Sequence, residues 1–307
     1  MKSPVLFIIY NRPDKTKTVF ETIRQYKPHK LYIAADGPNP KRLNDQEKTI
    51  ATREVVMKID WQCKVKTLFR KKNLGCKKAV SGAISWFFDD VESGIILEDD
   101  CLPDITFFDF CTQLLRKYKN NKRIMHISGD NFQRGIKRGK GDYYFSKYPH
   151  IWGWASWRSA WENYDPDMKS WPKNKNNKYF FKNKLEKIYW SDTFELAYKN
   201  NIDTWDYQWI YSIWRKRGLC IIPNTNLVTN IGFDEESTHT SKKNKYLKIP
   251  AGHLTKPLLH PKKIKICDEA DLYTSKHAFK INPGHIVIKK IFNIYKFIVT
   301  PFFYKLP

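Results

Sequence analysis

Short apolar runs alternate with amphipathic segments through the first hundred residues of this chain. The apolar runs predict strands at residues 5–10, 31–35, 64–69 and 94–97. Apolar residues at helical spacing predict helices at residues 14–25, 48–59 and 73–88. Strands and helices that alternate in this way build a mostly parallel sheet with right-handed crossovers. The pattern therefore predicts an α/β fold.

The second half of the chain is rich in aromatic residues, with three tryptophans within residues 148–158. Aromatic rings stack on sugars and bases, but they also anchor hydrophobic cores, and the core is the better interpretation for most of these tryptophans. Gly153, beside Trp154, is the place where the backbone is most able to approach a ligand closely. The lysine-rich stretch at residues 169–184 predicts an exposed loop or a helical excursion.

A further helix is predicted from residue 205 to residue 214, and Gly218 after a basic pair would be its C-cap. Asp206 lies in the first turn of this helix. A carboxylate there can simply complement the positive end of the helix dipole, or it can be a reactive group. The local pattern leaves both interpretations open.

The strand at residues 94–97 ends in three consecutive carboxylates, Glu98, Asp99 and Asp100. Acidic residues after a strand are often only a solvated turn or a helix cap. Three adjacent carboxylates repel one another unless a cation intervenes, however, and their oxygens suit Mg²⁺ or Mn²⁺. Such an ion can clamp a nucleotide diphosphate and stabilise it as a leaving group. We therefore expect an enzyme that acts on an activated, phosphate-bearing donor.

Polar residues also follow the first and second predicted strands. Asn11 and Arg12 come after the first strand, and Asp36 and Gly37 come after the second. In a doubly wound sheet, the carboxyl ends of parallel strands open on one crevice, so these residues should meet the acidic cluster there. The chain has neither a G-x-G-x-x-G nor a G-x-x-x-x-G-K-[ST] motif, which argues against a dinucleotide enzyme or a P-loop NTPase.

Composition narrows the class of protein. A hydrophobic content of 41%, with 15% aromatic residues, is ample for a core and excludes a disordered chain. The net charge of +24 predicts an acidic partner: nucleic acid, anionic lipid or the phosphates of a donor. Six scattered cysteines without a C-x-x-C pair argue against a zinc site or a disulfide framework. The first apolar run is too short for a signal peptide or a membrane span, which predicts a cytoplasmic protein.

The order of these elements resembles glycosyltransferases of the GT-A fold, and among them the N-acetylglucosaminyltransferase I family. The most specific likeness is a strand ending in Glu-Asp-Asp, then a turn and a Phe-Phe helix, as in residues 97–108. Further matches are Ser128-Gly129-Asp130-Asn131, Gly153-Trp154 ahead of Trp161, and Trp205-Asp206. Residues 206–223 also resemble the broad family 2 glycosyltransferases. The likeness covers roughly residues 4–240 and departs in the lysine-rich insert and the C-terminal tail.

The resemblance implies a GT-A domain at residues 1–240, with a nucleotide-sugar half at 1–101 and an acceptor half at 102–240. It implies a UDP-sugar as donor, and Asp100 as the direct ligand of Mn²⁺ or Mg²⁺. Asp99 and Glu98 would orient the ribose, metal waters or neighbouring backbone. The other residues that the resemblance assigns to the donor are Asn11, Arg12, Asp36 at the nucleobase, Gly37, Asn73, Gly75, Lys78, Gly153 and Trp154. His239 would complete the metal shell, and Lys78 has surface exposure as its alternative.

Sugar transfer to a hydroxyl also needs a proton acceptor, because an alcohol is a weak nucleophile at neutral pH. Asp206 is the predicted base. The metal on Asp100 would stabilise the departing diphosphate on the opposite side of the reacting carbon. Direct displacement of this kind inverts the configuration of the sugar.

Residues 241–307 form a basic, aromatic extension, with fourteen lysines and three acidic residues from Thr240 onward. This composition suits an interfacial segment on an anionic membrane, and packing on the catalytic domain is the alternative. A glycan or lipid-linked acceptor in surface polysaccharide assembly would account for peripheral binding to the inner face of a membrane.

Two other functions stay open. A nucleic-acid-binding protein would explain the positive charge, but the sequence contains no recognised binding module and its acidic cluster would have no role. We therefore expect no nucleic-acid partner. A sugar-nucleotide pyrophosphorylase would keep the sheet, but it needs a Gly-rich basic loop after the first strand, where residues 11–14 are Asn-Arg-Pro-Asp.

Overall fold

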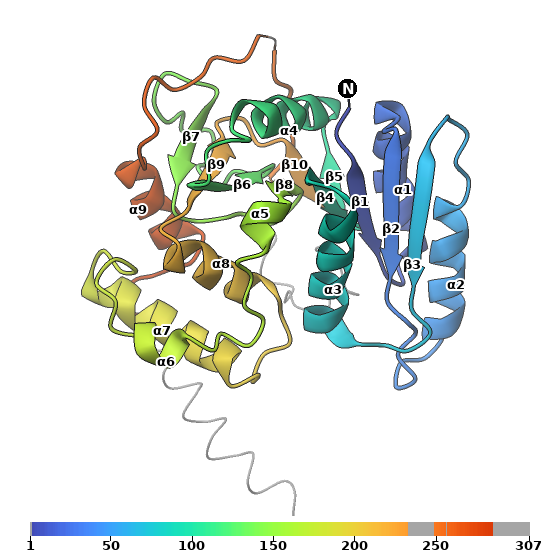
Figure 1. The fold of residues 1–307 in the computed structure, drawn as a ribbon, viewed down its shortest axis with the longest axis horizontal. Helices are drawn as coiled ribbons and strands as arrows, with labels where there is room; N and C mark the ends of the chain where they lie inside the picture. The colour runs from blue at the N-terminus through green and yellow to red at the C-terminus, as the bar shows by residue number, and fades with distance from the viewer. Residues whose placement is uncertain (1, 233–248, 256, 285–307) are drawn as a thin grey trace, which may run out of the picture.

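The computed structural model of the protein describes residues 2–232, 249–255 and 257–284. Its centre is an eight-stranded sheet in the order β3-β2-β1-β4-β8-β6-β9-β7, with helices on its faces (Figure 1). The eight strands are β1 Val5–Ile9, β2 Lys30–Ala35, β3 Lys64–Phe69, β4 Ser93–Glu98, β6 Ile124–Ser128, β7 Tyr143–Ser146, β8 Trp154–Trp157 and β9 Leu219–Pro223. The predicted α/β class is confirmed.

The first half of the sheet is parallel, as predicted. Strands β3, β2, β1 and β4 pair side by side in parallel, and every residue of β1 is buried. The connecting helices are α1 Pro13–Tyr26, α2 Asp45–Val56 and α3 Gly75–Asp90. Strands buried on both faces appear in a sequence as continuous apolar runs, which is why they could be recognised. Helix α3 lies between this half of the sheet and the rest of the molecule (Figure 1).

The second half of the sheet is mixed. Strand β8 runs antiparallel to both β4 and β6, β9 runs parallel to β6, and β7 runs antiparallel to β9. A separate antiparallel pair joins β5 Cys101–Pro103 to β10 Val228–Asn230. The helices of this half are α4 Ile105–Lys117, α5 Arg158–Trp161, α6 Trp171–Asn174, α7 Lys184–Tyr198, α8 Asp206–Arg215 and α9 Asp268–His277. The two halves share one continuous sheet.

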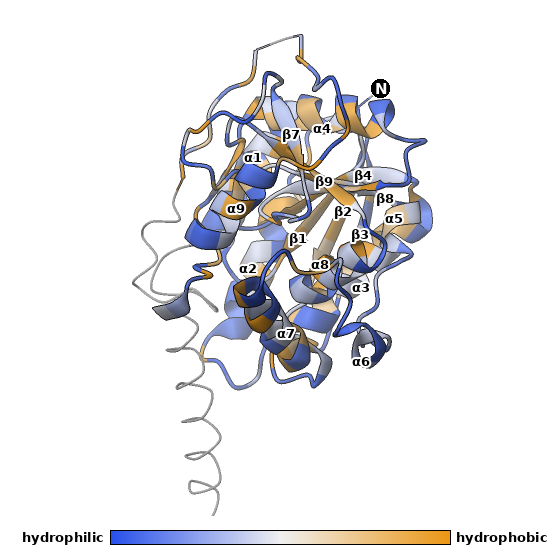
Figure 2. Ribbon diagram, turned by 90° about the vertical axis from the view of Figure 1, so that its left-hand side faces the viewer, coloured by the Kyte–Doolittle hydropathy of each residue, from blue (hydrophilic) through white to orange (hydrophobic). Residues whose placement is uncertain are grey.

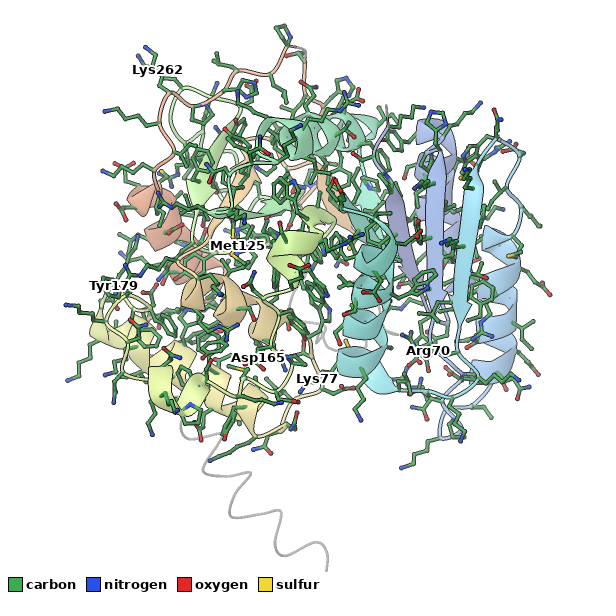
Figure 3. All side chains as sticks on the ribbon, in the orientation of Figure 1. Arg70, Lys77, Met125, Asp165, Tyr179 and Lys262 are labelled. Atoms are coloured by element: carbon green, nitrogen blue, oxygen red, sulfur yellow. The ribbon has the colours of Figure 1, made fainter. Side chains whose placement is uncertain are left out.

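Apolar residues concentrate in the strands and in the helix faces that cover them (Figure 2). Figure 3 shows side chains filling the space between the sheet and the helices, with Met125 in the interior and Lys262 at the periphery. The lysine-rich stretch is only partly an exposed excursion, because Trp171 and Phe180 within it are buried. All six cysteines are unpaired, in agreement with the sequence.

The end of α8 differs from the predicted glycine cap. The residue in the left-handed conformation is Arg217, with φ of 52°, and the Gly218 N–H donates to the Ile213 carbonyl at 2.9 Å. Gly218 is needed for space instead, because a Cβ at this position would lie 2.4 Å from the Met125 sulfur.

The described part of the C-terminal extension packs on the second half of the domain. Ile266 bridges to Phe145, and the Cys267 N–H donates to the Phe145 carbonyl at 2.8 Å. The first turn of α9 is tied down as well, since the Ser146 hydroxyl donates to Asp271 at 2.6 Å. Residues 249–255 and 257–284 therefore contact the domain, whereas the apolar and basic end of the extension, residues 285–307, lies outside the described residues and its predicted membrane association stays a prediction. No helix among the described residues is long and apolar enough to cross a membrane.

Candidate active site

A cavity of about 690 Å³ opens at the carboxyl ends of β1, β2 and β4, where α3 and the start of α8 meet them. Its wall on the first half contains Tyr10, Arg12, Asp36, Asn39, Arg42, Arg70, Asn73, Gly75, Cys76, Glu98, Asp99 and Asp100. Its wall on the second half contains Ile151, Trp152, Ile202, Asp203, Thr204, Trp205, Asp206, Tyr207, Asn230 and Gly232. The predicted crevice is therefore present, and it joins the two halves.

Arg12 supplies a positive charge inside the acidic cluster. Its Nη1 lies 2.7 Å from Asp100 Oδ2 and 3.5 Å from Asp99 Oδ1. All three side chains are largely shielded from solvent, so these contacts act at a lower dielectric than surface pairs do. The Arg12 guanidinium thus offsets part of the repulsion between the carboxylates, for which the sequence alone predicted a metal ion.

The remaining negative charge raises the pKa values of two carboxyl groups. Burial and the charges of Asp100 and Asp99 raise the pKa of Glu98 to about 8, with a further contribution from Asp206. Burial and Asp100 raise the pKa of Asp99 to about 7, against the opposing effects of Arg12 and the Tyr10 N–H. Glu98 and Asp206 come from opposite walls, so carboxylates of the two halves act on each other across the cavity.

The loop after β10 closes over Asp100. The Ile231 N–H donates to the Asp100 carbonyl at 2.8 Å, and the Gly232 N–H donates to Asn230 Oδ1 at 2.7 Å. A Cβ on Gly232 would lie only 2.2 Å from Asp100 Oδ2. Glycine is therefore required here, because the backbone passes directly over the carboxylate.

Asp36 binds backbone as well as lining the cavity. Its carboxylate accepts the N–H groups of Gly37 at 2.9 Å, Leu74 at 3.0 Å and Gly75 at 3.2 Å, which caps the start of α3. Burial raises the pKa of Asp36, and these amides partly offset that rise. Gly37 permits the close approach, because its Cβ would lie 2.4 Å from the Lys72 carbonyl carbon. Contact between Asp36 and a nucleobase stays a prediction.

Asn73 and Asn11 hold neighbouring loops in place. The Asn73 amide donates to the Gly37 carbonyl at 2.8 Å and to the Tyr10 hydroxyl at 3.2 Å. The Asn11 amide donates to Asp45, which also accepts the Tyr10 hydroxyl at 2.6 Å. Asn73 lines the cavity, whereas Asn11 lies outside its lining and supports it through Asp45.

Asp206 begins α8 and lines the cavity on the wall of the second half, where a reactive carboxylate could act. Its Oδ1 accepts a hydrogen bond from the Thr204 hydroxyl. The thiol of Cys76 lies among the acidic groups of both walls: burial raises its pKa, and the charges of Glu98, Asp203 and Asp206 raise it further. The predicted catalytic residue is thus in the same cavity as six of the predicted donor-binding residues, Arg12, Asp36, Asn73, Gly75, Glu98 and Asp99.

Asn11 and Gly37 lie beside the cavity lining but are not part of it, and three further predicted donor-binding residues lie elsewhere. Trp154 is wholly buried and stacks on Trp205 at 5.6 Å, so it is a core residue, and the prediction that it binds the donor is wrong. Gly153, at φ of 67°, packs against Val228 at a distance that only glycine allows and also lies outside the cavity lining. Lys78 is exposed on α3 and lines a different cavity. His239 lies outside the described residues.

The sequence did not identify several residues of this cavity. Arg42 and Arg70 add two cations to the wall that contains Arg12, and Trp152 supplies the aromatic surface that was assigned to Trp154. Strand pairing decides between the two tryptophans, since Trp154 is in register with Ile96 of β4 and faces the core. Arg42 and Arg70 lie in the strand-to-helix connections after β2 and β3, where no sequence motif marks them.

Among the described residues, no three His, Cys, Asp or Glu side chains form a ready cage for a metal ion. Mg²⁺ is often bound by only one or two carboxylates together with substrate phosphates. Asp100 and its neighbours fit a site of this kind, in which carboxylates and substrate phosphates hold the ion together. They provide carboxylate oxygens in a pocket whose negative potential raises the pKa of Glu98 and Asp99.

No protein-family model matches the sequence, and no curated protein is significantly similar to it. Among solved structures, the chain is similar to S. aureus TarS, at 10% identity and a TM-score of 0.42, over 74% of this chain and 59% of TarS. It is also similar to a UDP-glucose pyrophosphorylase in complex with UDP-glucose, at 13% identity and a TM-score of 0.39, over 75% and 93% of the two chains. The galactosyltransferase LgtC, solved with donor and acceptor sugar analogs, matches at 9% identity and a TM-score of 0.36, over 69% and 70%. Likeness at this level establishes no family.

Proposed function

We propose that this protein is a glycosyltransferase that moves a sugar from a nucleotide-sugar, UDP-linked, to a hydroxyl of a glycan or lipid-linked acceptor. The observation that carries the proposal is the single cavity in which Arg12, Asp99 and Asp100 of one half face Asp206 of the other. Donor phosphates require positive charge and acceptor activation requires a carboxylate, and this cavity contains both.

The donor would lie against the first half of the sheet. Arg12, Arg42 and Arg70 on that wall supply guanidinium groups, which recognise phosphate oxygens through forked hydrogen bonds. The backbone amides at the start of α3 favour negative charge as well, although Asp36 already occupies the first of them. Trp152 on the opposite wall offers an apolar surface to the sugar.

Asp206 would accept the proton of the attacking hydroxyl. It enters from the acceptor half, opposite Asp100, so attack and departure occur on opposite faces of the sugar carbon. This arrangement favours a single displacement with inversion of configuration. Thr204 keeps the carboxylate oriented by its hydrogen bond to Oδ1.

Asp100, assisted by Asp99 and Glu98, would hold Mn²⁺ or Mg²⁺ when the donor is bound. The ion would supply charge to neutralise the diphosphate. Arg12 would then share Asp100 with the ion or turn its guanidinium to the phosphates, and either arrangement keeps the net charge of the pocket balanced.

Calorimetric titration with UDP, with and without Mn²⁺, tests the proposal. We expect binding that depends on Mn²⁺ and that Asp100→Ala weakens at least about tenfold, the equivalent of 1.4 kcal/mol. Glu54→Ala, which removes an exposed carboxylate from α2, is the matched control and should bind as the unmodified protein does.

Each other outcome has a definite meaning. If the affinity for UDP is the same with and without Mn²⁺, and the same in Asp100→Ala, the metal ion has no place in the proposal. A failure to bind any nucleoside diphosphate would overturn the function itself. Formation of UTP from UDP-glucose and pyrophosphate would replace the transferase by the pyrophosphorylase alternative.

A further inference from the structure

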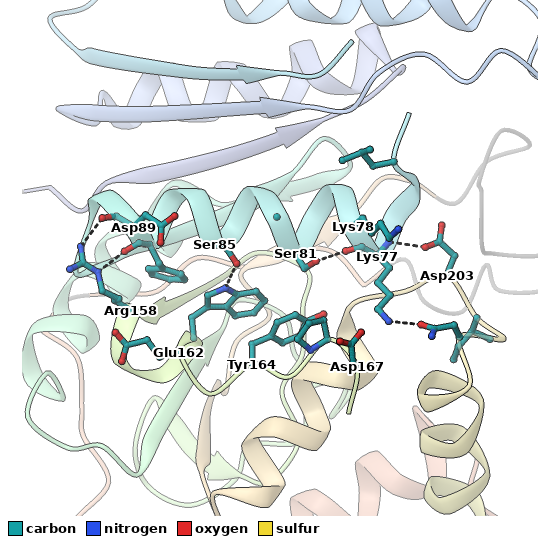
Figure 4. Close-up of a pocket in the computed structure, with 17 residues that line it drawn as sticks. Lys77, Lys78, Ser81, Ser85, Asp89, Arg158, Glu162, Tyr164, Asp167 and Asp203 are labelled. Atoms are coloured by element: carbon teal, nitrogen blue, oxygen red, sulfur yellow. Dashed lines mark hydrogen bonds between the residues drawn. The ribbon is translucent and has the colours of Figure 1, made fainter. Parts of the chain in front are cut away.

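A second cavity, of about 950 Å³, lies on the other side of α3 from the active-site cavity (Figure 4). One wall is the face of α3 that carries Lys77, Lys78, Ser81, Gly82, Ser85 and Asp89. The facing wall comes from the segment after β8, including Arg158, Glu162, Tyr164 and Asp167. We call this cavity the α3 groove.

The α3 groove exists because the middle of this helix face is small. Ser81, Gly82 and Ser85 replace the large apolar residues that a packed helix would present there. The Ser81 hydroxyl turns back to the Lys77 carbonyl at 2.6 Å, and Ser85 accepts the Trp161 indole N–H at 3.0 Å. The facing segment is therefore fixed at a distance that leaves the space open.

The chemistry of the walls is amphipathic. Phe88, Trp161 and Tyr164 supply the apolar part of the lining, although only 2% of Phe88 and 5% of Trp161 is exposed, and the Tyr164 ring stacks on Trp161 at 4.2 Å and 9°. Serine hydroxyls, lysines and carboxylates surround it. Sites for uncharged organic ligands combine an apolar lining with a few polar groups in this way, and a saccharide has apolar C–H faces and hydroxyl edges to match.

The α3 groove also departs from the charge of the whole protein. Its lining contains four carboxylates, Asp89, Glu162, Asp167 and Asp203, and three cations, Lys77, Lys78 and Arg158. Two of the cations are engaged within the protein: Lys77 donates to Asn200 Oδ1 at 2.6 Å, and Arg158 donates to the carbonyls of Phe88 and Asp89. The protein as a whole has 55 basic and 31 acidic residues, but the groove itself does not favour anionic ligands.

The α3 groove adjoins the active-site cavity. Ile202 and Asp203 line both cavities, and Asp206 follows three residues later. An elongated ligand that lies in the groove would pass Asp203 and reach the cavity that contains Asp206. On the basis of the proposed transferase function, we propose that the α3 groove binds the glycan part of the acceptor, and that this glycan is a neutral oligosaccharide.

The test measures binding of maltohexaose, cellohexaose and N-acetylchitohexaose, with a polygalacturonate oligomer as the acidic comparison. Ligand-observed NMR detects binding, and calorimetry gives Kd. Ser81→Phe fills the groove, and the double variant Glu162→Ala/Asp167→Ala removes two exposed carboxylates from its rim without touching the core. Glu54→Ala on α2 is the matched control.

We expect at least one neutral oligosaccharide to bind, with little dependence on salt, and each groove variant to weaken it about tenfold or more. The acidic oligomer should bind only through the general positive surface, with a steep salt dependence that the groove variants leave unchanged. The proposal is overturned if none of the neutral probes binds, or if both groove variants bind them as the control does.

A UDP titration of the same variants separates this proposal from the transferase function. Ser81→Phe should bind UDP with the affinity of the unmodified protein, because Ser81 lies outside the active-site lining. If the unmodified protein binds UDP but no oligosaccharide, the acceptor groove alone is refuted. If the unmodified protein does not bind UDP, the transferase function is refuted.

Discussion

Replacing Asp206 by asparagine separates the two interpretations of this residue, helix-dipole partner and catalytic base. Asparagine keeps the size of the side chain and an oxygen that can still accept the Thr204 hydroxyl. It loses the negative charge and the ability to take a proton. Loss of the charge should remove the dipole contribution in the first turn of α8, about 0.3–1 kcal/mol of folding free energy.

The catalytic cost should be much larger. A general base contributes about 10²- to 10⁴-fold to the rate, which corresponds to roughly 3–5 kcal/mol of transition-state stabilisation. We expect kcat for the UDP-sugar that proves to be the donor to fall by at least about a hundredfold, with UDP affinity unchanged. Glu54→Gln, which removes an exposed carboxylate on α2 far from both cavities, is the matched control and should keep the activity.

A second readout does not depend on turnover. Asp206 contributes to the raised pKa of Glu98, about 8, so removal of its charge should lower that pKa in an NMR titration of labelled glutamate side chains. Full activity in Asp206→Asn would refute the base assignment. An unchanged Glu98 pKa would refute the arrangement of the two carboxyl groups across the cavity.

Three other predictions concern folding. Asp203→Ala should lower the free energy of unfolding in urea by about 1–2 kcal/mol, because its carboxylate accepts two backbone N–H groups of α3 at 2.9 Å; an unchanged midpoint would contradict this capping role. Gly94→Ala should cost about 1–3 kcal/mol in the same assay, since its Cβ would lie 2.3 Å from the Phe87 ring, while Gly284→Ala, with no atom closer than 3.6 Å, should be neutral. The third prediction concerns metal-free protein in the presence of a chelator, where the pKa of Glu98 is raised to about 8 and that of Asp99 to about 7. Between the ordinary carboxyl pKa and these raised values, the folded protein still holds protons that the unfolded chain has already released. Stability should therefore fall as pH rises from about 5 to about 8, and this contribution should be smaller in Asp206→Asn.

The sequence predicted the first half of the fold well because the buried strands β1, β2 and β4 are continuous apolar runs, and the regular alternation of strand and helix placed the mostly exposed β3 as well. Strand β3 was predicted to the residue, and β1, β2 and β4 to within one. The convergence of Arg12, Asp36 and the acidic cluster followed from topology alone, since parallel strands open at one edge.

The second half was less predictable because its contacts depend on strand pairing. Trp152 and Trp154 flank one glycine, and only the antiparallel register of β8 on β4 shows which ring faces the core. The contact between Arg12 and Asp100 joins residues 88 positions apart. Neither has a local signal, so the sequence placed Trp154 rather than Trp152 at the cavity and did not predict the ion pair between Arg12 and Asp100.

Helix α3 connects these observations. Asp36 of the first half binds the amides of Leu74 and Gly75, and Asp203 of the second half binds the next two, at Cys76 and Lys77. The start of one helix is thus held by a carboxylate from each half.

The same helix separates the two cavities. Gly75, Cys76 and Ala79 face the active site, while Ser81 and Ser85 face the α3 groove. A shift of α3 would therefore change both cavities together. If the groove binds the acceptor, its occupancy should alter the α3 amides that Asp36 and Asp203 hold, and hydrogen exchange at those amides should slow when neutral oligosaccharide and UDP are both present. Slowing with UDP alone and no further change with oligosaccharide would show that the two cavities act independently.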